Sequence, residues 1–281
     1  WGEDKSIESN NGPLGFSGDN LGKGRTLPTQ NLVDAFPMKD GMFAGQGSKY
    51  TLNQSNPYEN RDPRLDYTIL HHGSSWLNNT LDISIGGVNN PSNSAEYSKT
   101  GYYMCKFMGK FGEESQYGNK IHLWVMFRYA EMLLNYAEAV YERDDKISNT
   151  DLNISLNLVR LRVNPAMTPL TNELITQNAG MDMRTEIRRE RTIELFNEGF
   201  RLDDLKRWKT AETEMPMDIV GIQWKGTEYE KVWANCPYET NAEGCIIIEK
   251  GRKWEEKNYL FPLPSDQLQL NPNLQQNPGW E

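Results

Sequence analysis

Apolar side chains recur at steps of three and four along residues 122–143, and this spacing predicts an amphipathic helix. Residues 149–163 repeat the pattern, and Pro165 ends it because the residue before a proline avoids the α region. A third helix is expected over residues 183–210, with a bend or a tight contact at Gly199. Since a short connection joins the first two segments, we expect them to pack as an antiparallel pair.

The N-terminal part of the chain lacks this regularity. Residues 1–120 are rich in glycine, asparagine, serine and proline, and the whole chain holds 27 asparagines, which favour turns. Only short strands are expected there, over residues 81–85 and 102–107. The many aromatic residues of this part argue against a wholly disordered segment.

The C-terminal part, residues 212–281, turns to strand and coil. Its segments 246–249 and 254–261 predict a hairpin, because a glycine-containing turn separates them. Further on, we expect a single helical turn that is capped by Ser265 or Asp266.

Composition excludes several kinds of protein. No apolar run approaches the roughly 18 residues of a transmembrane helix. The net charge of −9, from 39 acidic and 30 basic residues, disfavours a nucleic-acid binder, which needs a basic surface. The three cysteines form no C-x-x-C pair and the three histidines no metal-ligand spacing, so we expect neither a metal site nor another cofactor.

The densest group of charges lies between Ile187 and Trp208, and two interpretations compete for it. On one continuous helix its members would stack along one face. Carboxylates of this kind could do the acid and base work of a glycosidase, but that chemistry needs two of them facing each other across a substrate. We therefore favour a structural ion-pair ladder, in which at least one carboxylate meets an arginine from another element. The ladder consists of Glu190, Arg191, Glu194, Glu198, Arg201, Asp204 and Arg207.

No catalytic motif stands out elsewhere. The chain has no G-x-S-x-G, no H-E-x-x-H, no Walker loop and no G-x-G-x-x-G. Cys236 and Cys245 lie on either side of turn-forming residues, so in an oxidising compartment they could close a small loop. Two free thiols are the equally good alternative.

Six segments, in this order and spacing, resemble the SusD/RagB family. They cover residues 62–281, and the opening TLPTQNLVDAFPMKDG resembles the same family. The segments are DPRLDYTI, GYYMCKF, RYAEMLLNYAEA, LVRLRVNPAM, ERTIELFNEGFRLDDLKRW and the terminal FPLP…LQQNPGW.

The resemblance implies a mainly α fold with tetratricopeptide-like helix pairs, long irregular loops and a few short strands. We expect residues 1–281 to form the C-terminal half of such a protein, without its lipid-anchored N-terminal portion. Within this half, residues 1–120 would be the loop-rich ligand-binding segment, 121–211 the helical scaffold and 212–281 a closing segment of strand and coil.

For function, the resemblance implies non-catalytic capture of glycans at the cell surface. Such proteins are attached to the outer membrane by a lipid and deliver glycans to a SusC-like TonB-dependent transporter. The location also implies an oxidising surrounding, in which Cys236 and Cys245 would pair and Cys105 would stay free. The alternatives are a glycoside hydrolase and a peptide-binding member of the same family.

We expect the ligand contacts to come from residues 1–120, where asparagine-rich turns and aromatic rings coincide. Asparagine amides can hydrogen-bond sugar hydroxyls, and loops on a rigid scaffold are where binding residues usually lie. Trp76 is the first candidate, although its ring could instead attach the loop to the core. The candidates are Trp76, Tyr58, Asn78, Asn79, Tyr97 and Trp1.

Overall fold

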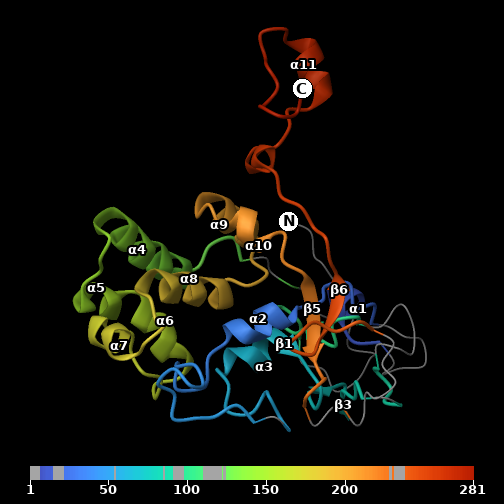
Figure 1. Cartoon of the computed structure of the whole chain (residues 1–281), viewed down its shortest axis with the longest axis vertical. Helices are drawn as coiled ribbons and strands as arrows, with labels where there is room; N and C mark the ends of the chain where they lie inside the picture. The colour runs from blue at the N-terminus through green and yellow to red at the C-terminus, as the bar shows by residue number, and fades with distance from the viewer. Residues whose placement is uncertain are drawn as a thin grey trace.

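The computed structural model is mainly helical, with a few short strands and long irregular connections, as the sequence predicts (Figure 1). A helical body lies beside a loop-rich body, and the C-terminal segment projects away from both. No helix among the described residues is long and apolar enough to cross a membrane. The structure describes residues 7–14, 22–53, 55–84, 86–90, 98–109, 122, 125–227, 230 and 238–281.

The helical body is built on α4, which packs against α6 and α8. Side-chain caps at Ser148, Thr171 and Asp182 accept backbone N–H groups at the starts of α5, α7 and α8. The apolar faces close a core that includes Leu134, Leu156 and Ile187. Its helices are α4 (Tyr129–Asp144), α5 (Asn149–Ile154), α6 (Leu156–Val163), α7 (Asn172–Gln177), α8 (Met183–Glu194), α9 (Arg201–Arg207) and α10 (Ala211–Glu214).

Each of the three predicted helices differs from the prediction, although the second keeps its predicted ends at Asn149 and Val163. The first helix begins only at Tyr129, because Arg128 has an extended backbone. The second is divided at Ser155, whose φ of −133° and ψ of −100° are not helical. The third ends at Glu194, since Asn197 and Gly199 take left-handed φ angles of 59° and 90° and turn the chain before α9.

The loop-rich body has only two-residue strands and short helices around a second core. This core holds aromatic rings, among them Phe36, Tyr102 and Tyr103. Strand β1 pairs with β4, and β2 pairs with β3, in both cases antiparallel. Its elements are α1 (Ile7–Asn11), α2 (Gln30–Ala35), α3 (Arg64–Thr68), β1 (Ile69–Leu70), β2 (Ser75–Trp76), β3 (Asn79–Thr80) and β4 (Tyr103–Met104).

The short strands differ from those predicted. The strand expected over 102–107 shrinks to β4, and residues 81–84 of the strand expected over 81–85 form none. Leu81 and Ile83 are nevertheless buried. The alternation of apolar residues here reflects packing into the core and not the pairing of β-strands.

The predicted hairpin of 246–249 with 254–261 is also wrong. Strand β6 (Cys245–Glu249) pairs antiparallel with β5 (Ile219–Gln223) instead, and Glu256–Tyr259 form the 3-10 helix η3. Strand β5 also approaches Thr100 closely, where the N–H of Ile222 donates to the Thr100 carbonyl at 2.8 Å. A Cβ on Gly221 would lie 2.7 Å from the Thr100 Cα, so this position requires glycine.

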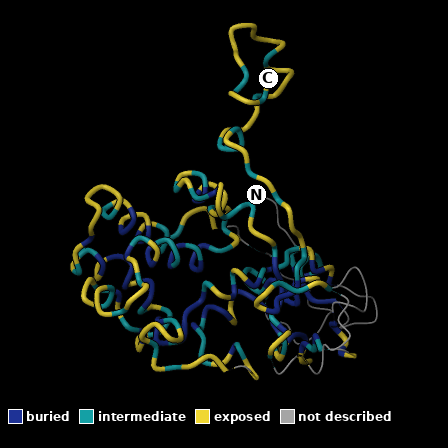
Figure 2. The backbone as a smooth tube through the Cα atoms, viewed as in Figure 1, coloured by how far each residue is buried: buried dark blue, intermediate teal, exposed yellow. Residues whose placement is uncertain are grey.

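The C-terminal segment is largely exposed along its length (Figure 2). Its helix α11 (Ser265–Leu270) buries no residue, and Leu270 keeps 78% of its surface exposed. The predicted helical turn is therefore present, but its cap is Pro264, which makes no side-chain capping bond.

Candidate functional site

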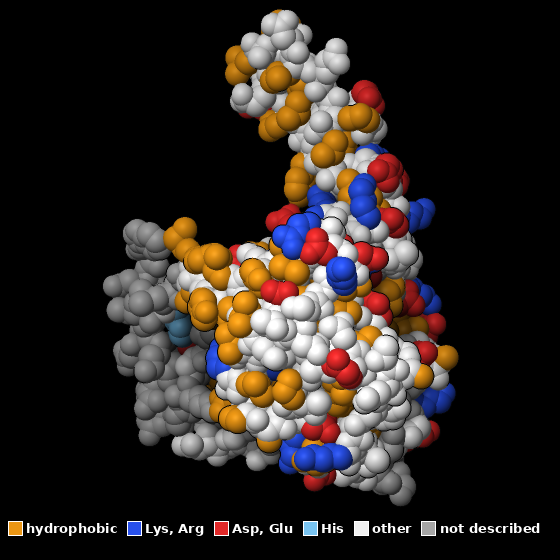
Figure 3. All heavy atoms as spheres, turned by 90° about the vertical axis from the view of Figure 1, so that its left-hand side faces the viewer, with side chains coloured by type: hydrophobic (Ala, Val, Ile, Leu, Met, Phe, Trp, Pro, Cys, Tyr) orange, Lys and Arg blue, Asp and Glu red, His pale blue; other side chains and the backbone are white. Residues whose placement is uncertain are grey.

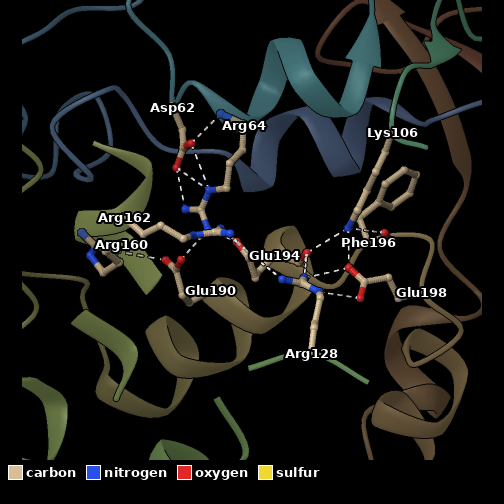
Figure 4. Close-up of polar contacts among 10 residues, drawn as sticks. All are labelled: Asp62, Arg64, Lys106, Arg128, Arg160, Arg162, Glu190, Glu194, Phe196 and Glu198. Atoms are coloured by element: carbon tan, nitrogen blue, oxygen red, sulfur yellow. Dashed lines mark hydrogen bonds and ion pairs between the residues drawn. The ribbon is translucent and has the colours of Figure 1, made fainter. Parts of the chain in front are cut away.

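Arg64 joins the loop-rich body to α8 through buried ion pairs. Its guanidinium lies 2.7 Å from Asp62, 2.5 Å from Glu190 and 3.1 Å from Glu194 (Figure 4). The side chains of all four residues are at most 9% exposed. Because α3 carries Arg64 and α8 carries the two glutamates, this contact joins segments more than 120 residues apart in the chain.

Three further segments extend the network through Glu194 and Glu198. Arg128, just before α4, lies 2.6 Å from Glu194 and 2.7 Å from Glu198. Arg162 of α6 lies 2.8 Å from Glu194, and Lys106, which follows β4, lies 2.6 Å from Glu198. All of these residues fall within the sequence segments that carry the family resemblance. The segments therefore meet in space around one network.

The remaining members of the predicted ladder lie apart from that network. Arg191 of α8 lies 2.8 Å from Asp204 of α9, and Arg207 contacts both Asp204 and Glu138 of α4. Arg201 contacts Glu214 of α10. The predicted arrangement along one helix face is thus wrong, because α8 ends before Glu198 and α9 is a separate helix.

Two carboxylates of the network, those of Glu194 and Glu198, have pKa values below the ordinary value. Burial raises the pKa of Glu194, but the guanidinium groups of Arg64, Arg128 and Arg162 outweigh it and hold that pKa below its ordinary value. Burial also raises the pKa of Glu198, but Arg128 and Lys106 outweigh burial and hold that pKa below its ordinary value. Carboxylates that are buried, ionised and occupied by arginines suit the joining of segments and not general acid catalysis.

A hollow of about 660 Å³ lies beside the β2–β3 hairpin. The hairpin turns through Leu77 and Asn78, whose φ angles of 50° and 57° correspond to the tight two-residue turn that matches strand twist. Asn78 in this turn is exposed and lines the hollow. The other polar side chains that line the hollow are Asp66, His71, Ser74, Ser75 and Cys105.

His71 is fixed in the wall of this hollow. Its Nε2 lies 2.9 Å from the Asp66 carboxylate and its Nδ1 lies 2.8 Å from the His72 carbonyl. The Tyr58 ring stacks on it, with ring centroids 3.8 Å apart. Behind Tyr58 lies Tyr102, whose hydroxyl donates to Gln30, and burial raises the Tyr102 pKa well above its ordinary value. Both ring nitrogens of His71 are thus engaged, and the lining of the hollow also contains carboxylate, hydroxyl and amide groups.

A comparison with protein families finds that the SusD family matches residues 2–280. The chain belongs to the SusD family. A search of curated protein sequences found no significant match.

Solved structures of SusD-like proteins share the fold. A SusD-like carbohydrate-binding protein from Bacteroides fragilis NCTC 9343 is 26% identical, with a TM-score of 0.75 over 96% of this chain and 51% of its own. A second SusD-like protein from the same organism is 26% identical, with a TM-score of 0.73 over 99% of this chain and 53% of its own. The SusD-family chain described here therefore spans about half the length of these relatives.

The structure separates the predicted ligand residues of this SusD-family chain. Trp76 and Tyr58 belong to the loop-rich core at 5% and 6% exposure, as the alternative for Trp76 held, although Trp76 also lines the first hollow. Asn78 and Asn79 are exposed on the hairpin. Tyr97 and Trp1 lie outside the described residues. Sequence reasoning missed Asp66 and His71, although His71 lies only five residues before Trp76 in the same candidate loop.

The cysteines and possible metal ligands add no further site. Cys245 is a free thiol buried in β6, and burial raises its pKa to about 11, which disfavours the thiolate needed for disulfide exchange. Cys236 lies outside the described residues. Among the described residues, no three histidine, cysteine or acidic side chains gather closely enough to hold a metal ion.

Proposed function

We propose that this chain captures glycans without cleaving them, and that the hollow beside the β2–β3 hairpin makes the contact. The observation that carries the proposal is the set of fixed polar groups around that hollow, next to an exposed asparagine turn. Such groups suit sugar hydroxyls, which need several donors and acceptors held in place. Two relatives of the same fold support it, one of them described as carbohydrate-binding.

The proposed setting follows from the family. We infer that the complete protein is attached by a lipid to the outer membrane, faces the cell exterior and delivers glycans to a SusC-like TonB-dependent transporter. Neither nucleic acid nor a metal is part of this proposal.

The arrangement of the carboxylates in the hollow and in the ion-pair network favours binding over hydrolysis. Asp66 is the one carboxylate among the described residues that line the hollow, whereas glycosidase chemistry needs two that face each other. Glu190, Glu194 and Glu198 are occupied by arginine and lysine side chains. Glycoside hydrolysis and peptide capture remain the two alternative functions, and the tests below must distinguish them from glycan capture.

Asn78→Gly tests the contact directly. Glycine keeps the left-handed backbone of the turn and removes the amide, so the fold should stay intact. We expect glycan binding to weaken by about 1 kcal/mol, the contribution of a typical hydrogen bond, as measured by calorimetry against a panel of oligosaccharides.

Asn197→Gly is the matched control, because Asn197 is also exposed, has a φ of 59° and does not line this hollow. It should leave glycan affinity unchanged. Equal affinity in wild type and Asn78→Gly would place the contact elsewhere, and binding of peptides but of no glycan would favour the peptide alternative.

A further inference from the structure

A second hollow, of about 500 Å³, lies next to the first. Its wall includes Lys39, Lys49, Tyr50 and Arg61, and Asp66 lines both hollows. Tyr58, which stacks on His71 in the wall of the first hollow, lines the second. The two hollows therefore share part of their walls.

Two ammonium groups of this second hollow gather around one aromatic ring. The Nζ atoms of Lys39 and Lys49 lie 4.8 and 5.3 Å from the centroid of the Tyr50 ring. Lys39 also donates to the Asn60 side-chain oxygen at 2.9 Å, which fixes its position. Among the described residues, no carboxylate lies within ion-pair distance of either lysine.

Arg61 adds a third positive charge that no ion pair balances within the described part of the chain. Its guanidinium donates to the main-chain carbonyls of Val33 and Phe36 at 2.7 Å and of Pro57 at 3.0 Å. Carbonyl groups satisfy its hydrogen bonds but leave its net charge in place.

The two acidic residues in the wall are already engaged. The Asp40 carboxylate accepts from the Ser48 hydroxyl at 2.9 Å and from the Lys49 and Met42 N–H groups at 2.9 and 3.2 Å. Asp66 lies 2.9 Å from His71. Neither forms an ion pair with the lysines, but each keeps its formal negative charge, so the three cations and two carboxylates of the lining leave a formal charge of +1 in a protein whose net charge is −9.

From this geometry we propose that the second hollow binds the acidic group of an anionic glycan, a carboxylate or a sulfate ester. The proposal rests on glycan capture as the function and adds the class of sugar. Two positioned ammonium groups complement a small anion, and local cations would offset the repulsion between an acidic protein and an acidic polysaccharide. Neutral sugars would gain nothing from them.

The test compares matched charged and neutral glycans on the whole chain. Oligogalacturonate and its methyl ester differ in carboxylate charge, and keratan sulfate and its desulfated form, which has no uronic acid, differ in sulfate charge. We expect wild type to bind at least one anionic member more tightly than its neutral counterpart. Lys39→Gln/Lys49→Gln should weaken that binding by about tenfold or more and reduce its salt dependence.

Two control variants make the result decisive. Lys225→Gln/Lys253→Gln removes the same net charge from exposed lysines outside the hollow and should leave affinity unchanged. Lys39→Arg/Lys49→Arg keeps the charge and should retain most of the binding. Equal affinity for every charged and neutral pair, or no loss in the glutamine variant, would overturn the anionic site while leaving glycan capture intact. Failure to bind any glycan would instead overturn both proposals.

Discussion

Glu194 receives guanidinium groups from three separate segments, although its own side chain is only 4% exposed. Several hydrogen bonds offset the cost of burying this charge, and the removal of one member leaves the others unpaired in the interior. The sequence allowed the prediction that the carboxylates of this region are structural. It could not identify Arg64 or Arg128 as partners, because such contacts depend on the fold and not on local spacing.

Substitution of Glu194 tests this role. Glu194→Ala should lower the free energy of unfolding by about 3–5 kcal/mol, because it leaves buried arginines without their carboxylate. Urea unfolding measures the change. Arg162→Ala, whose side chain is 57% exposed, should cost less than about 1 kcal/mol. An unaltered unfolding free energy in Glu194→Ala would contradict the structural role of the network.

The residue-scale predictions of the ligand site met a different obstacle. Trp76 and Tyr58 looked available because residues 1–120 contain few regularly spaced apolar positions. A core made of irregular loops has no periodicity to reveal it, and this one uses those rings. Because Trp76 is buried, its replacement would disturb the core, and Asn78 is the better probe of binding.

At the scale of elements, helices could be predicted where an apolar face is continuous: α6 and α8 lie within predicted ranges, and α4 exceeds its range by one residue, Asp144. Several ends of these helices could not be predicted. Non-helical backbone angles at Ser155, Asn197 and Gly199 interrupt the helices at points where the apolar spacing continues. Strand pairing was missed at β5–β6 because its register depends on residues far apart in sequence.

Gly199 is the clearest test of these interruptions. Its φ of 90° is unfavourable for a residue with a Cβ, although no atom lies within 4 Å of the position where a Cβ would be. Gly199→Ala should therefore destabilise the chain by about 1–2 kcal/mol through backbone strain alone. Gly199→Asn should cost less, because asparagine tolerates left-handed backbone better. Thermal unfolding measures the change. Increased stability of Gly199→Ala would instead favour one continuous helix over residues 183–210.

At the scale of the whole molecule, the ion-pair network joins the helical body to the loop-rich body (Figures 1 and 4). The loop-rich body lines the first hollow, and both bodies line the second, to which Val163, Asn164 and Ala166 contribute. Hydrophobic side chains also gather on the face of the molecule that Figure 3 shows. Several large hydrophobic residues of α4 are exposed, and Tyr129 is 71% exposed. The fold class and the family could be predicted from the sequence because several motif segments occur in order. The hollows could not, because residues from distant segments line them.

Capture without cleavage is the central claim, and affinity electrophoresis combined with a reducing-end assay tests it most directly. Wild-type protein runs through gels that contain neutral or acidic polysaccharides, and the same polysaccharides are incubated with it in solution. We predict that at least one polysaccharide retards the protein and that no new reducing ends are released. Release of reducing ends, or the absence of retardation by every polysaccharide, would contradict the account.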